Sequence, residues 1–181
     1  MSWSIDTAHS EINFAIQHMM ITKVRGQFEK FNGKINFDAQ SLENITVEIE
    51  IEIDSINTRE AKRDAHLRSA DFFDADNFPK MTFKSTKVEK TGENRARLTG
   101  DLTIRDITRQ VTLDVEHTGV AVNPYGKTVA GFSARGKINR KEWELNWNVA
   151  LETGGWLVGE EVEINIELQL VKETETEAVS A

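Results

Sequence analysis

The chain has 181 residues, a length typical of one domain that can bury a core without disulfides or metals. Its 30 acidic and 22 basic residues give a net charge of -8, which argues against whole-protein attraction to nucleic acid or to anionic lipid surfaces. The absence of cysteine excludes disulfides, a thiolate nucleophile and cysteine-ligated metal sites.

The first residues contain no basic region followed by an apolar run, so the sequence predicts no secretory signal. No segment approaches the roughly 18 apolar residues of a membrane-spanning helix. We therefore expect a cytoplasmic protein with no nucleic-acid partner and no stable membrane insertion.

The first predicted strands alternate between apolar and polar residues, which is the pattern of a half-buried strand. One face carries Ile12, Phe14, Ile16 and His18. In the next, residues 45–53, the apolar positions are Ile45, Val47, Ile49, Ile51 and Ile53, and the residues between them include Glu48, Glu50 and Glu52. These glutamates fit a solvated outer face better than a cation site, because same-face residues of a strand lie about 6 to 7 Å apart.

One segment interrupts the strands. Residues 57–69 are rich in helix formers, and Asn57 followed by Glu60 fits an N-capping arrangement. The sequence predicts one helix of about three turns whose thin apolar stripe, formed by Ala61, Ala65 and Leu67, rests on the barrel surface or across one end.

Alternation returns in five later segments, separated by glycine- and proline-containing turns that favour antiparallel pairing. Their apolar faces are Leu98, Leu102 and Ile104; Val111, Leu113, Val115 and His117; Ala130, Phe132, Ala134 and Ile138; Trp143, Leu145, Trp147 and Val149; and Val162, Ile164, Ile166, Leu168 and Leu170. Residues 172–181 are polar without periodicity and predict a disordered tail.

Long strands with one apolar face each can form a sandwich or close into a barrel. Ten residues, 45–54, span roughly 33 Å, which at the usual tilt gives a barrel about 25 Å tall. A barrel of about eight strands is either filled by its own side chains or holds one ligand, and the pattern alone leaves both open. Because association costs roughly 4 to 15 kcal/mol, only a large apolar ligand would bind well.

Candidate catalytic groups are few. His9 lies beside Ser10 and Asp6, but neighbours in sequence rarely form a catalytic triad. His18 and His117 fall on apolar strand faces, where a hydrogen-bonded core histidine is the favoured interpretation. Trp143, Trp147 and Trp156 suit a core more than a sugar-stacking surface.

An ordered set of short patterns resembles the YceI-like family over residues 3–171. The patterns are Asp6-x-x-His9-Ser10, Phe14, His18-Met19, Val24-Arg25-Gly26-x-Phe28, Ile56-x-Thr58, Arg63-Asp64-x-His66-Leu67-Arg68-Ser69-x-Asp71-Phe72-Phe73, Phe78-Pro79, Phe83-x-Ser85, Gly100-Asp101-Leu102-Thr103-Ile104, Phe132-x-Ala134, Asn139-Arg140 and Val158-Gly159-x-x-Val162. The chain departs from the family at Trp143-Glu144, where a Phe-Gly pair is expected, and at Trp156, which replaces a smaller aliphatic residue.

This resemblance implies a lipocalin-like antiparallel β-barrel of about eight long strands, with the one helix (about residues 57–69) in a connection. It implies a non-enzymatic protein, often a homodimer and in many relatives periplasmic, that binds a polyprenyl chain or an isoprenoid quinone in its tunnel and needs no other cofactor and no metal. The expected domain is 1–171, followed by the tail 172–181. The expected ligand-binding residues are Phe14, Ile16, His18, Ile49, Ile51, Phe83, Leu102, Val115, Phe132, Trp147 and Ile166.

Two alternatives remain at this point. A packed barrel without ligand would make the protein a dimeric stress-response or interaction module. A hydrolase or isomerase would use His9, Ser10 or His66 near a barrel mouth.

Overall fold

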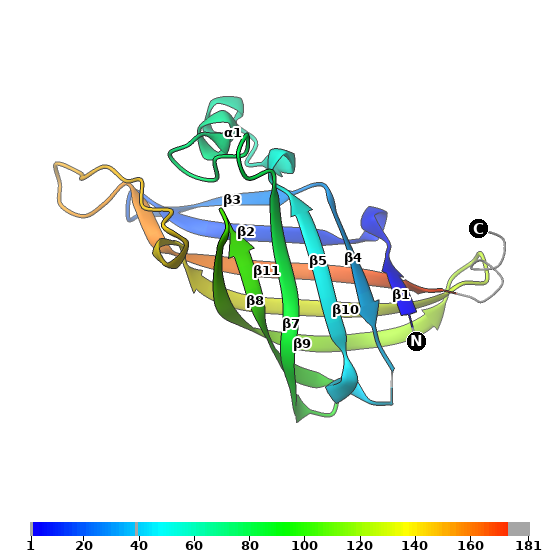
Figure 1. The fold of residues 1–181 in the computed structure, drawn as a ribbon. Helices are drawn as coiled ribbons and strands as arrows, with labels where there is room; N and C mark the ends of the chain where they lie inside the picture. The colour runs from blue at the N-terminus through cyan, green and yellow to red at the C-terminus, as the bar shows by residue number, and fades with distance from the viewer. Residues whose placement is uncertain (1, 39, 174–181) are drawn as a thin grey trace.

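The computed structural model describes residues 2–38 and 40–173, which form a set of strands and one helix that lies at one end of them (Figure 1). The strands are β1 (Ser2–Ile5), β2 (Glu11–His18), β3 (Thr22–Phe28), β4 (Phe31–Asn36), β5 (Thr46–Glu52), β6 (Ile56–Asn57), β7 (Lys80–Gly92), β8 (Arg95–Ile104), β9 (Ile107–Val122), β10 (Thr128–Asn139) and β11 (Val158–Lys172). The helix is α1 (Ala61–Arg68), and short 3-10 turns are η1 (Thr7–His9), η2 (Leu42–Asn44), η3 (Ile53–Ser55) and η4 (Arg140–Trp143).

The strands close into an antiparallel barrel of eight positions. At three of these positions, two consecutive strands follow one another along the same line of the barrel wall. These pairs are β1 with β2, β3 with β4, and β5 with β6. Each position then pairs with its neighbours in sequence, and β11 pairs with β1 and β2 to close the ring. The predicted lipocalin-like barrel of about eight strands with one helix in a connection is confirmed.

The predicted faces of β5 are those observed. Val47, Ile49 and Ile51 are buried inside the barrel. The glutamates point outward and pair with lysines of β7: Glu48 lies 3.6 Å from Lys84, and Glu50 contacts Lys80, which lies diagonally across from it. Within the described chain no cluster of His, Asp or Glu side chains is arranged to hold a metal ion.

The helix is shorter than predicted and begins later. It spans Ala61–Arg68, and its N-cap is Glu60, whose carboxylate accepts a hydrogen bond from the Arg63 amide. Asn57 instead ends β6, and its side chain accepts from the Arg59 amide in a turn that precedes the helix. The 57–69 boundaries were wrong because Asn57 caps this turn, where Arg59 has positive φ.

The predicted apolar stripe of the helix was wrong in part. Leu67 packs against the core, but Ala61 and Ala65 are exposed, and the buried residue of α1 is Asp64. Asp64 accepts hydrogen bonds from the Thr58 amide, at 2.9 Å, and from the Thr58 hydroxyl, at 2.5 Å. Arg63 donates through Nε to the same hydroxyl at 2.7 Å. A polar clasp therefore holds α1 across one end of the barrel (Figure 1).

Residues 143–149 do not form the strand that their alternation predicted. Trp143 ends the 3-10 turn η4, and Glu144 takes a left-handed conformation after it. Trp143 is completely buried, and its indole N–H donates to the Leu102 carbonyl at 2.9 Å. The Trp143 side chain thus packs into the barrel from a turn, whereas the sequence pattern predicted that Trp143 lies on a strand.

An aromatic cluster seals the barrel end opposite α1. The ring of Phe37 meets those of Trp3, His117 and Phe132 at centroid distances of 5.6, 5.0 and 4.9 Å. The Trp3 indole donates to the Phe37 carbonyl at 3.0 Å, and His117 Nδ1 lies 3.0 Å from the Gly131 carbonyl. The expectation of a hydrogen-bonded core histidine therefore holds for His117.

Lys172 extends β11 one residue into the predicted tail, and residues 174–181 of that tail lie outside the described residues. Across the described parts of the chain, no helix has the length and apolar character needed to cross a membrane.

Truncating the aromatic seal tests its contribution to stability. Phe37 is 1% exposed, so Phe37→Ala is expected to lower the free energy of unfolding by about 3 to 5 kcal/mol through lost burial and a residual cavity. Tyr125 is 88% exposed, and Tyr125→Ala is the control, with a change of about 0.5 kcal/mol or less. Denaturant unfolding measures both, and equal losses would contradict the seal.

Candidate functional site

The barrel encloses an apolar cavity of about 550 Å³. This volume lies inside the range of about 300 to 1,000 Å³ that small-molecule pockets occupy. Side chains from all eight strand positions line it, together with residues of η4, of α1 and of the segments that flank the helix. A packed interior, which one alternative required, is therefore not what the barrel contains.

All eleven residues predicted to bind a ligand line this one cavity. They are Phe14, Ile16, His18, Ile49, Ile51, Phe83, Leu102, Val115, Phe132, Trp147 and Ile166. Those on β5, β7 and β8 are buried, whereas Phe14, Ile16 and Ile166 on the opposite wall keep part of their surface accessible from the cavity. Their contact with a ligand stays a prediction.

Two glycines keep aromatic rings out of the middle of the cavity. Phe14 pairs with Gly26 across β2 and β3, and a Cβ on this glycine would lie 2.5 Å from the Phe14 ring. A Cβ on Gly100 of β8 would lie 2.4 Å from the ring of Phe83 on β7. Each ring therefore lies flat against the wall over a glycine, which leaves the space beyond it free.

The polar part of the lining gathers near α1. Thr58, Arg63 and His66 line the cavity there, and so do the exposed residues Glu60 and Lys62. Exposed Gln17, at the end of β2, lines it as well. Since residues that line the cavity are also exposed here, the cavity reaches the surface between α1 and the end of β2.

His66 sits at this opening between a carboxylate and two rings. Its Nε2 lies 2.8 Å from an Asp71 oxygen, and its ring stands edge-on to Trp147 and Phe72 at 4.5 and 5.1 Å. The Ser69 hydroxyl donates to the His66 backbone carbonyl at 2.6 Å, and no hydroxyl is among the described contacts of the His66 ring, so the structure does not pair this imidazole with a nucleophile. The arrangement offers an aromatic edge with one polar ring at the cavity entrance.

His9, Ser10 and Asp6 do not form a triad. His9 Nδ1 lies 2.9 Å from Asp6 on the surface, whereas the Ser10 hydroxyl accepts from the Gln169 amide at 3.0 Å. The serine therefore fixes β11 beside η1 and is not aligned with the histidine.

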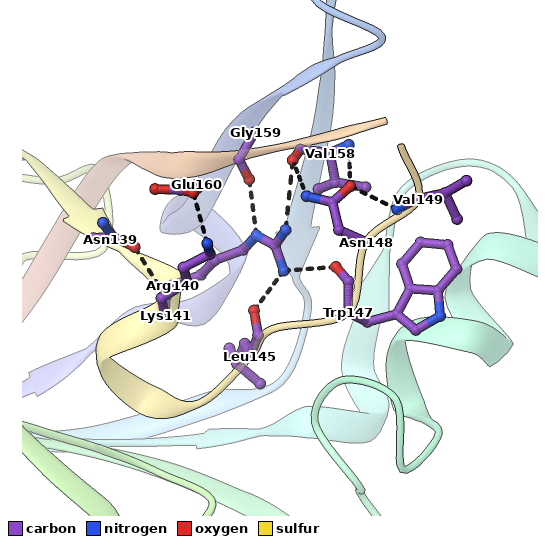
Figure 2. Close-up of polar contacts among 10 residues, drawn as sticks. All are labelled: Asn139, Arg140, Lys141, Leu145, Trp147, Asn148, Val149, Val158, Gly159 and Glu160. Atoms are coloured by element: carbon purple, nitrogen blue, oxygen red, sulfur yellow. Dashed lines mark hydrogen bonds and ion pairs between the residues drawn. The ribbon is translucent and has the colours of Figure 1, made fainter. Parts of the chain in front are cut away.

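Arg140 is a buried guanidinium surrounded by backbone carbonyls (Figure 2). Its Nε donates to Gly159 at 2.8 Å, and its Nη1 donates to Trp147 at 3.0 Å and to Leu145. Burial lowers the pKa of this guanidinium, and the nearby charge of Glu160 acts in the opposite direction. The group stays charged and satisfies carbonyls that have no strand partner.

Asn148 completes the attachment of this loop to β11 (Figure 2). Its Nδ2 donates to the Val158 carbonyl at 2.7 Å, and its Oδ1 accepts from the Val158 amide at 3.0 Å. Side-chain hydrogen bonds thus replace the strand pairing that the alternation at 143–149 predicted, and they place Trp147 over the cavity.

Sequence reasoning placed Arg63 and Arg140 in structural motifs and missed that both line the cavity. It also omitted Phe72 and Trp143, which line the cavity from outside the strands. The signal available was the family pattern around residues 63–73, because strand alternation says nothing about residues that reach the cavity from loops.

A closed antiparallel barrel with an apolar interior defines a lipocalin-like class of protein. A family model, the YceI-like domain, matches residues 3–170. A UPF0312 protein of Staphylococcus aureus (strain USA300) is 40% identical over 162 residues, which cover 89% of this chain and 92% of that protein. The chain belongs to the YceI-like family.

Solved structures agree with this assignment. The YCEI protein of Campylobacter jejuni is similar with a TM-score of 0.75 and 34% identity, covering 87% of this chain and 90% of that one. A polyisoprenoid binding domain from Saccharophagus degradans shares the fold with a TM-score of 0.66 at 14% identity, covering 94% and 98% of the two chains.

Adding a methyl group at Gly26 tests how the cavity is kept open. Gly26→Ala is expected to push the Phe14 ring inward and to lower the free energy of unfolding by about 1 to 3 kcal/mol. In the control Gly92→Ala the new Cβ would lie 3.5 Å from its nearest neighbour, so stability should be unchanged or higher. Denaturant unfolding compares them, and a neutral Gly26→Ala would refute the argument.

Shortening the buried guanidinium tests the loop attachment. Arg140→Lys leaves several buried carbonyls without a donor and is expected to cost at least about 2 kcal/mol of unfolding free energy. Lys141 belongs to the same turn but makes a surface ion pair with Glu160, so Lys141→Met should leave the unfolding midpoint unchanged. If the two variants unfold alike, Arg140 does not organise this loop.

Proposed function

We propose that the protein binds, sequesters or transports a long apolar isoprenoid lipid in its barrel without catalysing a reaction. The observation that carries the proposal is the apolar cavity of about 550 Å³ enclosed by the barrel. A polyprenyl chain or an isoprenoid quinone tail presents a matching surface of hydrocarbon with no hydrogen-bonding groups. The fold shared with a polyisoprenoid binding domain supports this choice of ligand class.

The chemistry of the lining also suggests how the lipid is oriented. Burying about 400 Å² of its chain against the walls contributes on the order of 10 kcal/mol, which is comparable with the association cost of roughly 4 to 15 kcal/mol. The chain would occupy the part between Phe14, Phe83 and Phe132, toward the sealed end. The polar end would stay near His18 and His66, where the cavity reaches the surface.

The enzyme alternative gains no support from the described side chains. Asp6, His9 and Ser10 are not aligned, and the imidazole ring of His66 has no hydroxyl partner among its described contacts. A binding role requires only shape and apolar surface, which the cavity supplies.

Filling the cavity tests the proposal directly. Purified protein is extracted with organic solvent, and the extract is analysed by lipid mass spectrometry. Ala134→Trp would place an indole beside Ile166 and Val115 in the cavity. Displacing about two methylenes of guest at about 0.8 kcal/mol each should lower the lipid retained per protein about tenfold.

The matched control is Ala121→Trp, at an exposed position of β9 that is not part of the cavity lining. It should retain lipid like the unaltered protein. Protein that carries no isoprenoid and retains no added polyprenol would overturn the proposed function.

A further inference from the structure

Five exposed apolar side chains gather at one end of the molecule on two adjacent loops. Met19, Met20 and Ile21 form the turn between β2 and β3, with exposures of 44, 54 and 79%. Val149 and Trp156, at 46 and 52%, belong to the loop before β11. Both loops project at the same end of the barrel (Figure 1). We refer to these five residues as the apolar rim.

The two loops are in direct contact. The Met19 amide donates to the Leu157 carbonyl at 2.7 Å. A Cβ placed on Gly155 would lie 3.1 Å from Cγ of Met20, which shows how closely the loops approach. Asn148 fastens the base of the second loop to β11. The rim is therefore one surface on a fixed base.

The rim lies next to the cavity opening. His18 directly precedes Met19, Leu157 directly follows Trp156, and both of these neighbours line the cavity. Gln17, exposed at the end of β2, lines it too. A molecule that enters or leaves through this opening therefore passes beside the rim.

The turn itself carries residues that its backbone does not favour. Met19 and Met20 have φ of 52° and 66°, and the Ile21 amide donates to the His18 carbonyl at 3.2 Å, as in a type I′ turn. Such turns favour Asn-Gly because both central residues need positive φ. Two methionines here accept backbone strain and also expose apolar surface, which points to a role for that surface.

The amino-acid composition of the apolar rim indicates which kind of partner it can bind. The chain is 29% charged, yet residues 19–21 carry no charge and residues 147–157 contain only Glu152. Ionic attraction to a charged partner therefore has no basis here. Flexible methionines, a branched aliphatic tip and an indole suit the boundary between headgroups and acyl chains, where tryptophan is enriched.

We propose that the apolar rim docks into the interface of a lipid bilayer and brings the cavity opening to the membrane from which the isoprenoid is taken. The inference rests on the proposed function for its purpose, because a long isoprenoid resides in a bilayer and not in water. The loop tips insert shallowly into the bilayer, and the binding does not depend on ionic attraction to lipid headgroups.

The experiment measures binding to phosphatidylcholine vesicles by sedimentation, and transfer of undecaprenol from these vesicles to the protein. Ile21→Lys is expected to weaken vesicle binding about tenfold, since burying an isoleucine contributes on the order of that factor. Trp156→Lys should act in the same direction. Both positions are exposed, so folding should be preserved, and circular dichroism checks this.

Val122 is the matched control, because it is 69% exposed on the β9–β10 hairpin at the other end of the molecule. Val122→Lys should leave vesicle binding unchanged. Binding that is absent in the unaltered protein, or that falls equally in Val122→Lys and Ile21→Lys, would overturn the proposal. So would an Ile21→Lys effect on self-association alone, measured by light scattering, which would assign the rim to a protein interface.

Delivery of undecaprenol from dilute ethanol separates this inference from the proposed function. If the apolar rim acts at the membrane, the Ile21→Lys variant takes up undecaprenol from ethanol at the normal rate and takes it up slowly from vesicles. If the unaltered protein binds vesicles but takes up undecaprenol by neither route, the proposed function fails while bilayer docking stands.

Discussion

Closure of the eight-stranded ring is the constraint on which the rest of this structure depends. Once β11 pairs with both β1 and β2, every strand position of the described residues has a neighbour on each side, and the diameter of the barrel is set by strand number and stagger. Side chains must then fill the enclosed space or leave it open. Here Phe14 and Phe83 lie flat over Gly26 and Gly100, so two of the largest inward side chains occupy the wall and not the centre.

The two ends of the barrel are closed by different kinds of interaction. At one end the rings of Trp3, Phe37 and Phe132 exclude water through apolar contact. At the other end, Asp64 and Arg140 each satisfy backbone groups that no strand partner reaches. The polar end can contain an opening because its backbone groups are already paired, whereas the aromatic end depends on continuous packing.

The sequence predicted the barrel well because successive residues of a strand point to opposite faces of the sheet. Apolar residues at every second position therefore mark the face that is buried. Ile49 and Ile51 alternate with glutamates, and the structure places them on opposite sides of the wall. The same pattern failed at 143–149, where alternation is accidental: Arg140 takes the carbonyls of Leu145 and Trp147 that a neighbouring strand would have used. The alternation of apolar and polar residues does not distinguish a true strand such as β5 from residues 143–149, because Arg140, which donates to these carbonyls, lies outside the alternating residues.

The cavity itself was beyond the reach of the pattern. Alternation fixes which side chains point inward, but the volume left between them depends on ring orientation and on glycines across the sheet. Nothing local to Phe14 says that its ring will lie over Gly26, since that contact requires the register between β2 and β3. The family resemblance supplied the expectation of a tunnel that periodicity left open.

An open apolar interior has an energetic consequence for the folded barrel. An apolar space of about 550 Å³ leaves the side chains around it without packing partners on one side, and lost packing of this kind is unfavourable. An apolar ligand that filled the cavity, as the proposed function requires, would supply the missing contacts and stabilise the folded state through binding. Under the proposed function, release of the ligand would remove this stabilisation.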